Sequence, residues 1–311
     1  MKRFRRLTWL FCLSLVAVLR PEELPEPPPK EGLRVATYNL RNYLSMDRLV
    51  EGRYRLDYPK REIEKAVVRE TILALEADVL AVQEVGSQDF LRELREDLAR
   101  DGLVYHGMAL VRGEDQSRMV GALWREDRGF SVESLEHVDL DFTIFGEASR
   151  VKRGMLELRV RIASTDQELA LFALHLKSKY TDDERDPQSS LRRAGEAQAA
   201  RDRILRRCSE PSRNMFVIAG DLNDGPHSSA VRRFLSKGEV QISRLQDHSD
   251  HQKQIWTHFY EKGAEYSRID YLLVSPGLEA VAVLNGGVYW HEDFFRGSDH
   301  RPVWMDIRFP K

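Results

Sequence analysis

The chain has 311 residues, 48 Lys and Arg against 50 Asp and Glu, and a formal net charge of −2. This length suits one large domain or two small ones, and a hydrophobic content of 42% is enough for a buried core. The balanced charge excludes a uniformly basic surface, and the two cysteines, Cys12 and Cys208, leave the body of the chain without a disulfide or a zinc-type Cys/His spacing.

The first 20 residues are typical of an export signal or of an N-terminal membrane anchor. Four basic residues within positions 2–6 precede an apolar run over residues 7–19. That run is shorter than the about 20 residues that a membrane-spanning helix needs, which favours a cleaved signal over membrane attachment through the run. Residues 21–32 are rich in Pro and Glu and predict an extended linker before a domain over 33–311. We therefore expect a periplasmic or extracellular domain, or one anchored outside the cytoplasm at the inner membrane.

Predicted strands and helices alternate from residue 33 to the end of the chain. Strands are expected at 33–38, 78–82, 119–124, 155–160, 168–174, 215–219, 268–274 and 303–307, and helices at 57–76, 90–98 and 189–208. Interspersed elements without an internal repeat predict one mixed α/β domain in which helices cover sheets. The polar stretch 177–188 is expected to be a mobile loop, either a solvated connection or a flap beside a substrate.

Polar side chains recur where the predicted strands end. Each of them alone is explained by a turn, a helix cap or a surface ion pair. Together they favour a functional site, because buried acids and imidazoles cost desolvation energy unless they are paired or bind something. The residues are Asn39, Glu84, His175, Asp221, Asn223, Asp270, Asp299 and His300.

These residue types suit the hydrolysis of phosphate esters. Glu84 and Asp299 offer carboxylates and Asn39 an amide oxygen, the oxygen ligands that a hard cation such as Mg²⁺ prefers. Asp221 is the candidate base that deprotonates an attacking water. The remaining residues supply hydrogen-bond donors to the phosphate and an acid that supports an imidazole.

Three residues are candidate donors to the phosphoryl oxygens, on which charge develops: His175, His300 and Asn223. Asp270 is placed to fix the tautomer of a neighbouring imidazole and to raise its basicity. Lys177 and Lys179 follow His175 closely and are candidates for contacts with substrate phosphates.

Six segments resemble motifs of the endonuclease/exonuclease/phosphatase superfamily and occur in its order. They are Ala36–Arg41, Ala81–Glu84, Leu174–Ser178, Gly220–Asn223, Arg268–Tyr271 and Ser298–Val303. The resemblance implies a DNase I-like four-layer α/β/β/α sandwich and dependence on Mg²⁺ or Mn²⁺. It maps Asn39, Glu84 and Asp299 to the metal centre, Asp221 and Asn223 to the water and the transition state, His175 and His300 to the scissile phosphate, and Asp270 to the support of His300.

Two arginines extend the resemblance to the DNase I-like branch. Arg41 stands where that branch has an Arg that reaches toward DNA, and Arg153 where it has an Arg beside the phosphate. The next residue of that branch is a Glu that braces the first catalytic His. Here it is Gly154, so His175 has no obvious carboxylate partner.

The sequence leaves three functions open. The first is an exported, monomeric, divalent-metal-dependent phosphodiesterase that cuts DNA or RNA without an obligate protein partner. The second is a phospholipid or inositol-phosphate phosphohydrolase of the same superfamily, consistent with the aromatic residues at 142–145 and 294–295. The third, a catalytically inactive binding module, predicts missing site residues. A His/Asp cluster between residues 247 and 258 is expected to be a solvated loop.

Overall fold

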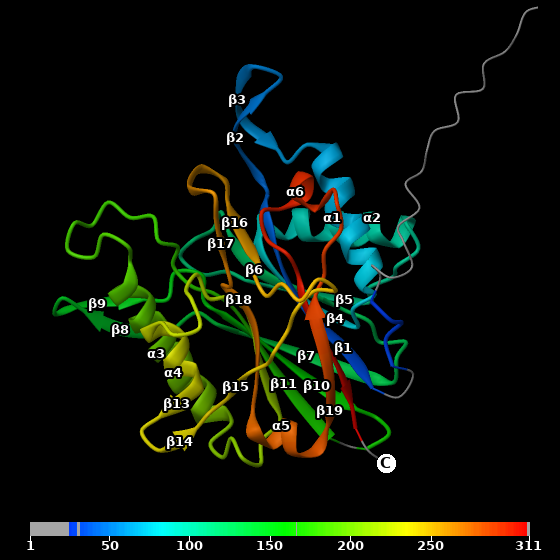
Figure 1. Cartoon of the computed structure of the whole chain (residues 1–311), viewed down its shortest axis with the longest axis vertical. Helices are drawn as coiled ribbons and strands as arrows, with labels where there is room; N and C mark the ends of the chain where they lie inside the picture. The colour runs from blue at the N-terminus through cyan, green and yellow to red at the C-terminus, as the bar shows by residue number, and fades with distance from the viewer. Residues whose placement is uncertain (1–24, 30–31, 166, 310–311) are drawn as a thin grey trace, which may run out of the picture.

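The computed structural model describes residues 25–29, 32–165 and 167–309 (Figure 1). The predicted leader, residues 1–20, lies outside the described residues. Within the described part, no helix combines the length and the apolar character that crossing a bilayer requires. In the proline-rich stretch, Pro28 and Pro29 are buried, and the carbonyl of Pro29 accepts a hydrogen bond from Arg128 at 2.7 Å. This end of the stretch therefore packs on the domain.

One six-stranded sheet carries the first and last strands of the domain. Its order is β19 (Val283–Val288), β20 (Val303–Arg308), β1 (Leu33–Tyr43), β4 (Val79–Val85), β6 (Met119–Trp124) and β5 (Gly107–Val111). β1 runs parallel to β4 and antiparallel to β20. The helices α1 (Glu62–Leu75) and α2 (Gln88–Arg100) pack on its outer face, where their apolar residues share a core with outward-facing residues of β1 and β4.

The second six-stranded sheet is built from the middle of the chain. Its order is β15 (Arg244–Leu245), β18 (Asp270–Val274), β12 (Phe216–Asp221), β11 (Gln167–His175), β10 (Met155–Ile162) and β7 (Phe130–His137). β11 and β12 are parallel, and the other neighbours pair antiparallel. The helices α3 (Ser190–Arg207) and α4 (Ser229–Leu235) cover its outer face through a further apolar core.

The period of two in the strands separates the cores. In β1, Val35 faces the other sheet, while Ala36 and Tyr38 face the helices. The inward residues of both sheets form the central core, which gives four layers in the order helix, sheet, sheet, helix. The predicted α/β/β/α sandwich is therefore confirmed.

Short elements complete the fold. They are the hairpins β2–β3 (Ser45–Val50, Arg53–Pro59), β8–β9 (Asp141–Ile144, Glu147–Arg150), β13–β14 (Ser236–Lys237, Val240–Gln241) and β16–β17 (His258–Tyr260, Glu265–Ser267), the helices α5 (Pro276–Val281) and α6 (Phe294–Gly297), and the 3₁₀ turn η2 (Glu261–Gly263). β2–β3, β16–β17 and α6 stand at one end of the sandwich and α5 at the other (Figure 1).

The helix predicted over 57–76 is wrong at its start, because residues 53–59 form β3 and the helix begins at Glu62. Pro59 explains the difference, since the residue before a proline avoids the helical region. At the start of the helix, Glu64 Oε2 accepts hydrogen bonds from the backbone N–H and the Nε of Arg61, and the Glu64 N–H donates to the Arg61 carbonyl. The hairpin has no sequence signature of a buried face, since Leu49 and Leu56 are exposed.

Candidate active site

Three neighbouring strands of the second sheet place titratable side chains in one row. In the strand register, His175 of β11 is opposite Asp221 of β12, and Asp221 is opposite Asp270 of β18. All three continue the inward-facing sets of their strands, which include Ala173 and Ala219 of the central core. They are at most 2% exposed, so a buried polar row closes the apolar core at this end.

Asp221 is held from several sides. Its Oδ2 accepts a hydrogen bond from Asn39 Nδ2 at 3.0 Å, and its Oδ1 accepts one from the backbone N–H of Asn223 at 2.8 Å. The preceding Gly220 has φ +137°, and a Cβ there would lie 2.0 Å from the carbonyl oxygen of Leu174. A glycine is therefore required for β12 to approach β11 next to Asp221.

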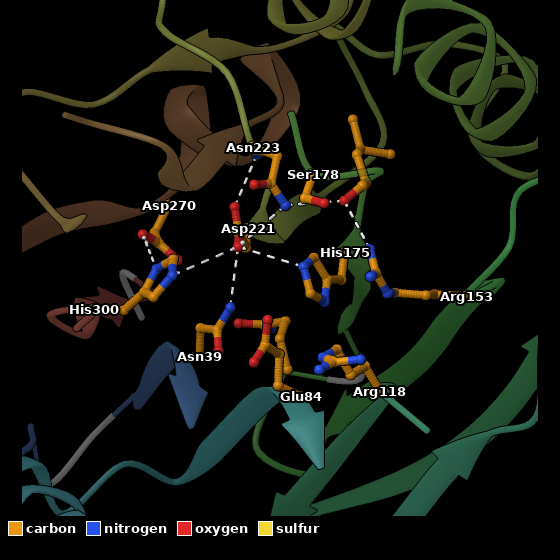
Figure 2. Close-up of polar contacts among 12 residues, drawn as sticks. Asn39, Glu84, Arg118, Arg153, His175, Ser178, Asp221, Asn223, Asp270 and His300 are labelled. Carbon is orange, nitrogen blue, oxygen red and sulfur yellow. Dashed lines mark hydrogen bonds and ion pairs between the residues drawn. The ribbon is translucent and has the colours of Figure 1, made fainter. Parts of the chain in front are cut away.

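His300 enters the row from the segment before β20. Its Nδ1 lies 2.9 Å and 3.1 Å from the two carboxylate oxygens of Asp270, and its Nε2 lies 3.9 Å from Asp221 Oδ2 (Figure 2). Burial opposes the imidazolium charge, but Asp270, Asp221 and Asp299 outweigh it and raise the pKa of His300 from 6.5 to about 10. His300 is therefore a buried imidazolium at neutral pH.

Asp221 and His175 are shifted toward their neutral forms. Burial and the charge of Asp270 raise the pKa of Asp221 from 3.8 to about 7. Burial, with the positive charges of Arg153 and His300, holds the pKa of His175 well below its ordinary value. His175 Nε2 lies 3.4 Å from Asp221 Oδ2. Asp221 thus titrates near neutrality beside a neutral imidazole.

The surroundings of His175 agree with the expectation drawn from Gly154, which stands where the DNase I-like branch has a bracing Glu. Its Nδ1 is buried and has no hydrogen-bond partner among the described residues. Gly154 itself has φ +67°, where a Cβ would come within 2.9 Å of the His137 carbonyl oxygen. The only carboxylate near His175 in the described chain is Asp221, on the Nε2 side.

A β-bulge aims Glu84 at the site. The register of β4 with β6 shifts between Gln83 and Val85, and Glu84 has φ +59°. Strict alternation would point Glu84 toward the helices, because Gln83 keeps the inward position and bonds Thr37. At the bulge, Glu84 Oε2 accepts a hydrogen bond from the backbone N–H of Asn42 at 2.9 Å.

Asp299 and Asn39 meet Arg41 at the same edge. Asp299 Oδ2 lies 3.5 Å from Arg41 Nε, and Asn39 Oδ1 accepts a hydrogen bond from the Arg41 backbone N–H at 3.0 Å. Ser298 Oγ donates to the Asn39 carbonyl and accepts from the backbone N–H of His300. The loop before β20 is thereby tied to the end of β1.

These side chains border a cavity of about 540 Å³ between the ends of the two sheets. The predicted site residues that line it are Arg41, Glu84, Lys179, Asp221, Asn223, Asp299 and His300. Asn39, His175 and Asp270 do not line it but contact Asp221 or His300 directly behind it. The fold therefore collects ten of the twelve predicted residues in one place.

Arg153 and Lys177 lie outside the cavity lining. Arg153 is 8% exposed, and its guanidinium donates hydrogen bonds to Asp115 and to the Leu176 carbonyl. Lys177 Nζ donates to the carbonyls of Ser178 and Tyr180. Arg153 therefore braces the residue that follows β11, and Lys177 braces the start of the segment 177–188.

The segment 177–188 borders the cavity, as the flap alternative requires. Ser178, Lys179 and Gln188 are among its lining residues. The buried Arg193 of α3 donates to the carbonyls of Lys177 and Gln188, so one guanidinium fixes both ends of the segment.

The hairpin β16–β17 brings to the cavity a histidine that the sequence analysis assigned to a solvated loop. His258 lines the cavity, and its ring centroid lies 4.5 Å from that of His300. The expectation of a solvated loop over 247–258 is wrong, because His248 and Asp250 are buried and Asp250 binds the buried Arg301 at 2.6 Å. The only sequence signal was the alternation within the hairpin, which is too short to stand out.

Arg118 was also missed. It lies beside Glu84 in Figure 2, and its Nε donates to Asn42 Oδ1 at 2.8 Å. Arg118 ends a polar loop directly before β6, and no periodicity or motif marks it there.

Two groups of side chains offer metal ligands. Asp221, Asp270 and His300 each present a ligand atom within 4.8 Å of the others and are buried. Glu84 and Asp299 present carboxylates to the cavity beside Asn39. All members of the second group offer oxygen, the donor set of Mg²⁺ and Mn²⁺.

The layers and this site define the class of DNase I-like α/β/β/α sandwiches. The model of the endonuclease/exonuclease/phosphatase family matches residues 36–300, and the chain belongs to this family. It is therefore a member of a family of phosphoesterases. A sequence search of curated proteins gave no match.

Solved structures resemble the whole domain. The human Nocturnin catalytic domain with bound sulfate aligns with a TM-score of 0.63 at 16% identity, over 94% of this chain and 100% of that one. An endonuclease/exonuclease/phosphatase from Bacteroides vulgatus gives 0.60 at 15% identity over 89% and 99%. Beta toxin from Staphylococcus aureus gives 0.60 at 14% identity over 88% and 99%. At these identities the likeness establishes the fold.

Proposed function

We propose that this chain is a divalent-metal-dependent phosphodiesterase that cuts DNA or RNA by in-line attack of water. One observation carries the proposal. The buried row of His175, Asp221, Asp270 and His300 meets a cavity that the carboxylates of Glu84 and Asp299 also line. Such a cavity offers a base, charged donors and a cation site around one position, which is what phosphoryl transfer requires.

The metal fits the cavity-lining carboxylates of Glu84 and Asp299, with Asn39 buried behind the lining, better than the buried group. In that group His300 holds its Nδ1 on Asp270 and is protonated, so it has no free lone pair for an ion. Glu84 and Asp299 are hard oxygen donors at the cavity surface. Bound there, Mg²⁺ or Mn²⁺ would polarise a phosphoryl oxygen and neutralise developing charge.

Asp221 is the residue that we assign as the general base. With a pKa of about 7, it is ionised in a large fraction of molecules at neutral pH yet basic enough to accept a proton. Asn39 and Asn223 hold its two oxygens in place. His175 supports it from β11 as a neutral imidazole.

His300 is the donor to the phosphoryl oxygens in this proposal. Its Nδ1 is committed to Asp270, so Nε2–H is the proton that remains for a substrate. The nearest carboxylate oxygen to that nitrogen in the described chain belongs to Asp221, at 3.9 Å, which is beyond a strong hydrogen bond. An imidazolium held this way stabilises an anionic transition state without reorganisation.

Arg41 and Lys179 favour a polyanionic substrate, because both line the cavity that would hold the scissile phosphate. A phospholipid or inositol phosphate is the second candidate. The observation that favours it is the exposure of Tyr266 and Phe295 near the cavity.

The experiment is a cleavage panel with the purified full chain. Plasmid DNA, single-stranded RNA, phospholipid vesicles and inositol phosphates are incubated with Mg²⁺, Mn²⁺ or EDTA. We expect cleavage of nucleic acid that EDTA abolishes and that Asp221→Asn and His300→Gln reduce by at least about a hundredfold. Arg213→Gln, at an exposed arginine before β12 and at the other end of that strand from Asp221, is the matched control and retains activity. No cleavage of any substrate with any divalent ion would overturn the assignment.

We also propose that the domain works outside the cytoplasm. The basic and apolar order of residues 1–20 supports export. Mass spectrometry of the native protein should find an N-terminus between residues 17 and 30. An intact Met1 in a membrane fraction would support the anchor instead, and an intact Met1 in the cytosol would contradict export.

A further inference from the structure

The hairpin β16–β17 separates two environments at the edge of the catalytic cavity. His258 pairs with Ser267 and Tyr260 with Glu265, and all four residues line the catalytic cavity. Phe259 lies between them and projects to the opposite face, because successive residues of a strand alternate.

A second cavity of about 450 Å³ lies on that side of the hairpin. Both cavities are lined by Arg41, Tyr260 and Asp299. The two spaces therefore adjoin beside Asp299, one of the candidate metal ligands. A group attached to a phosphate in the first cavity can therefore extend into the second. The volume is in the range of pockets that hold small molecules.

Aromatic rings form one wall of the second cavity. The Phe259 and Phe295 ring centroids are 5.3 Å apart in an edge-to-face arrangement. Phe295 also lies parallel to Trp256 at an interplanar angle of 11°, and Trp256 carries the buried Arg301 guanidinium 3.6 Å from its ring centroid. The packing holds these rings in place, yet Phe295 remains 39% exposed and available for stacking.

Charges of both signs surround this aromatic wall. Arg41 and Lys262 supply cations, and Glu261 and Asp299 supply carboxylates. An acyl chain placed here would desolvate these charges and offer them no hydrogen bond, which costs free energy. A planar heterocycle with polar edges satisfies them while its face stacks on a ring.

We propose that the second cavity binds the nucleobase of a nucleotide that flanks the scissile phosphate. The inference rests on the proposed nuclease function and names the part of the substrate that the chain recognises. The base stacks on Phe295 or Tyr260, and Arg41 and Lys262 stay near the adjoining phosphates. Stacking accepts any base, so the subsite selects for the presence of a base rather than for its identity.

The test compares single-stranded oligonucleotides that share one cleavable linkage. In two of them a tetrahydrofuran abasic residue replaces the nucleotide on the 5′ or the 3′ side of that linkage. We expect the full chain to cleave one abasic substrate with kcat/KM lower by roughly 5- to 100-fold, which is the range of base–aromatic stacking. Phe295→Leu and Tyr260→Leu reduce the preference for the normal over the abasic substrate. Phe295→Tyr, which keeps an aromatic ring, retains the preference.

The matched control is Phe145→Leu, which alters an aromatic side chain of similar exposure (40%) that does not line either cavity. It keeps the wild-type preference. If the full chain cleaves all three oligonucleotides equally, the nucleobase subsite is refuted while the nuclease function stands. If it cleaves no oligonucleotide but hydrolyses phospholipid vesicles, both proposals fail. If Phe295→Leu lowers cleavage of normal and abasic substrates alike, the ring has a structural role and the inference is overturned.

Discussion

Replacing Asp270 with Asn tests the electrostatics of the site without relying on a substrate. The substitution keeps the shape of the side chain but removes the charge that faces His300 Nδ1 at 2.9 Å. Burial alone lowers the pKa of an imidazole, so the raised value of about 10 depends on the acids around it. We expect the pKa of His300 in Asp270→Asn to fall by about 1–3 units.

The magnitude follows from the linkage between protonation and folding. The His300 pKa is 6.5 ordinarily and about 10 in the folded chain, and at 1.36 kcal/mol per unit this gives about 5 kcal/mol as an upper order of magnitude. Because the folded pKa is raised, the contribution is complete below pH 6.5 and is lost as the pH rises through about 10. In Asp270→Asn, the contribution of His300 protonation to the free energy of unfolding is smaller and is lost at a lower pH.

The measurement is a ¹⁵N NMR titration of the imidazole between pH 5 and 11, together with urea unfolding at pH 6 and pH 9. Asp183→Asn is the control, because Asp183 makes a similar bidentate contact with Arg185 but is 39% exposed at the side chain. It should leave both the His300 titration and the free energy of unfolding essentially unchanged, because the pair is exposed to solvent. A His300 midpoint that is the same in the wild type and in Asp270→Asn would refute the reasoning.

Three further predictions concern stability and metal binding. Asp306→Asn leaves the fully buried Arg34 without its bidentate partner (2.7 and 2.9 Å) and should cost about 3–5 kcal/mol in urea unfolding. The exposed Asp183→Asn should leave the free energy of unfolding essentially unchanged, and equal losses in the two variants would contradict this. Burial and Arg268 lower the pKa of His248 from 6.5 to about 3, so the folded chain excludes a proton that the unfolded chain takes up. The free energy of unfolding should therefore fall by up to about 1.4 kcal/mol per pH unit as the pH drops below 6.5. If the free energy of unfolding of a His248→Phe variant falls with pH at the same slope, His248 is not the origin of the dependence. Mg²⁺ at a hundred times its Kd should raise stability by about 2.7 kcal/mol, seen as a higher Tm that EDTA reverses; the same rise in Glu84→Gln would place the ion elsewhere.

Most of the fold was predictable because it depends on local patterns. Alternating apolar strands and interspersed helices indicated layers of sheets and helices, and the motif order indicated the particular sandwich. The failures are short elements in which the hydrophobic pattern is weak. The β2–β3 hairpin leaves Leu49 and Leu56 exposed, so no alternation of buried residues marked it.

The candidate site was predictable as a set of residues rather than as a geometry. Asn39 and Asp221 are 182 positions apart, and only the packing of one sheet on the other brings Asn39 Nδ2 within 3.0 Å of Asp221. The pKa of Asp221 near 7 also depends on this packing, since burial and the neighbouring strand cause it. The sequence contains neither distance nor burial.

What the sequence determined by itself is the chemistry available: the acids, amides and imidazoles at strand ends and the α/β/β/α order that carries them. Tertiary structure alone decided how they are used. The bulge turns Glu84 into the cavity, backbone carbonyls and Asp115 engage Arg153 and Lys177 outside its lining, and a hairpin brings His258 and an aromatic wall beside it. The physical reason is that side-chain period and residue type are local properties, whereas register, bulges and contacts between layers are set by the packing of segments distant in the chain.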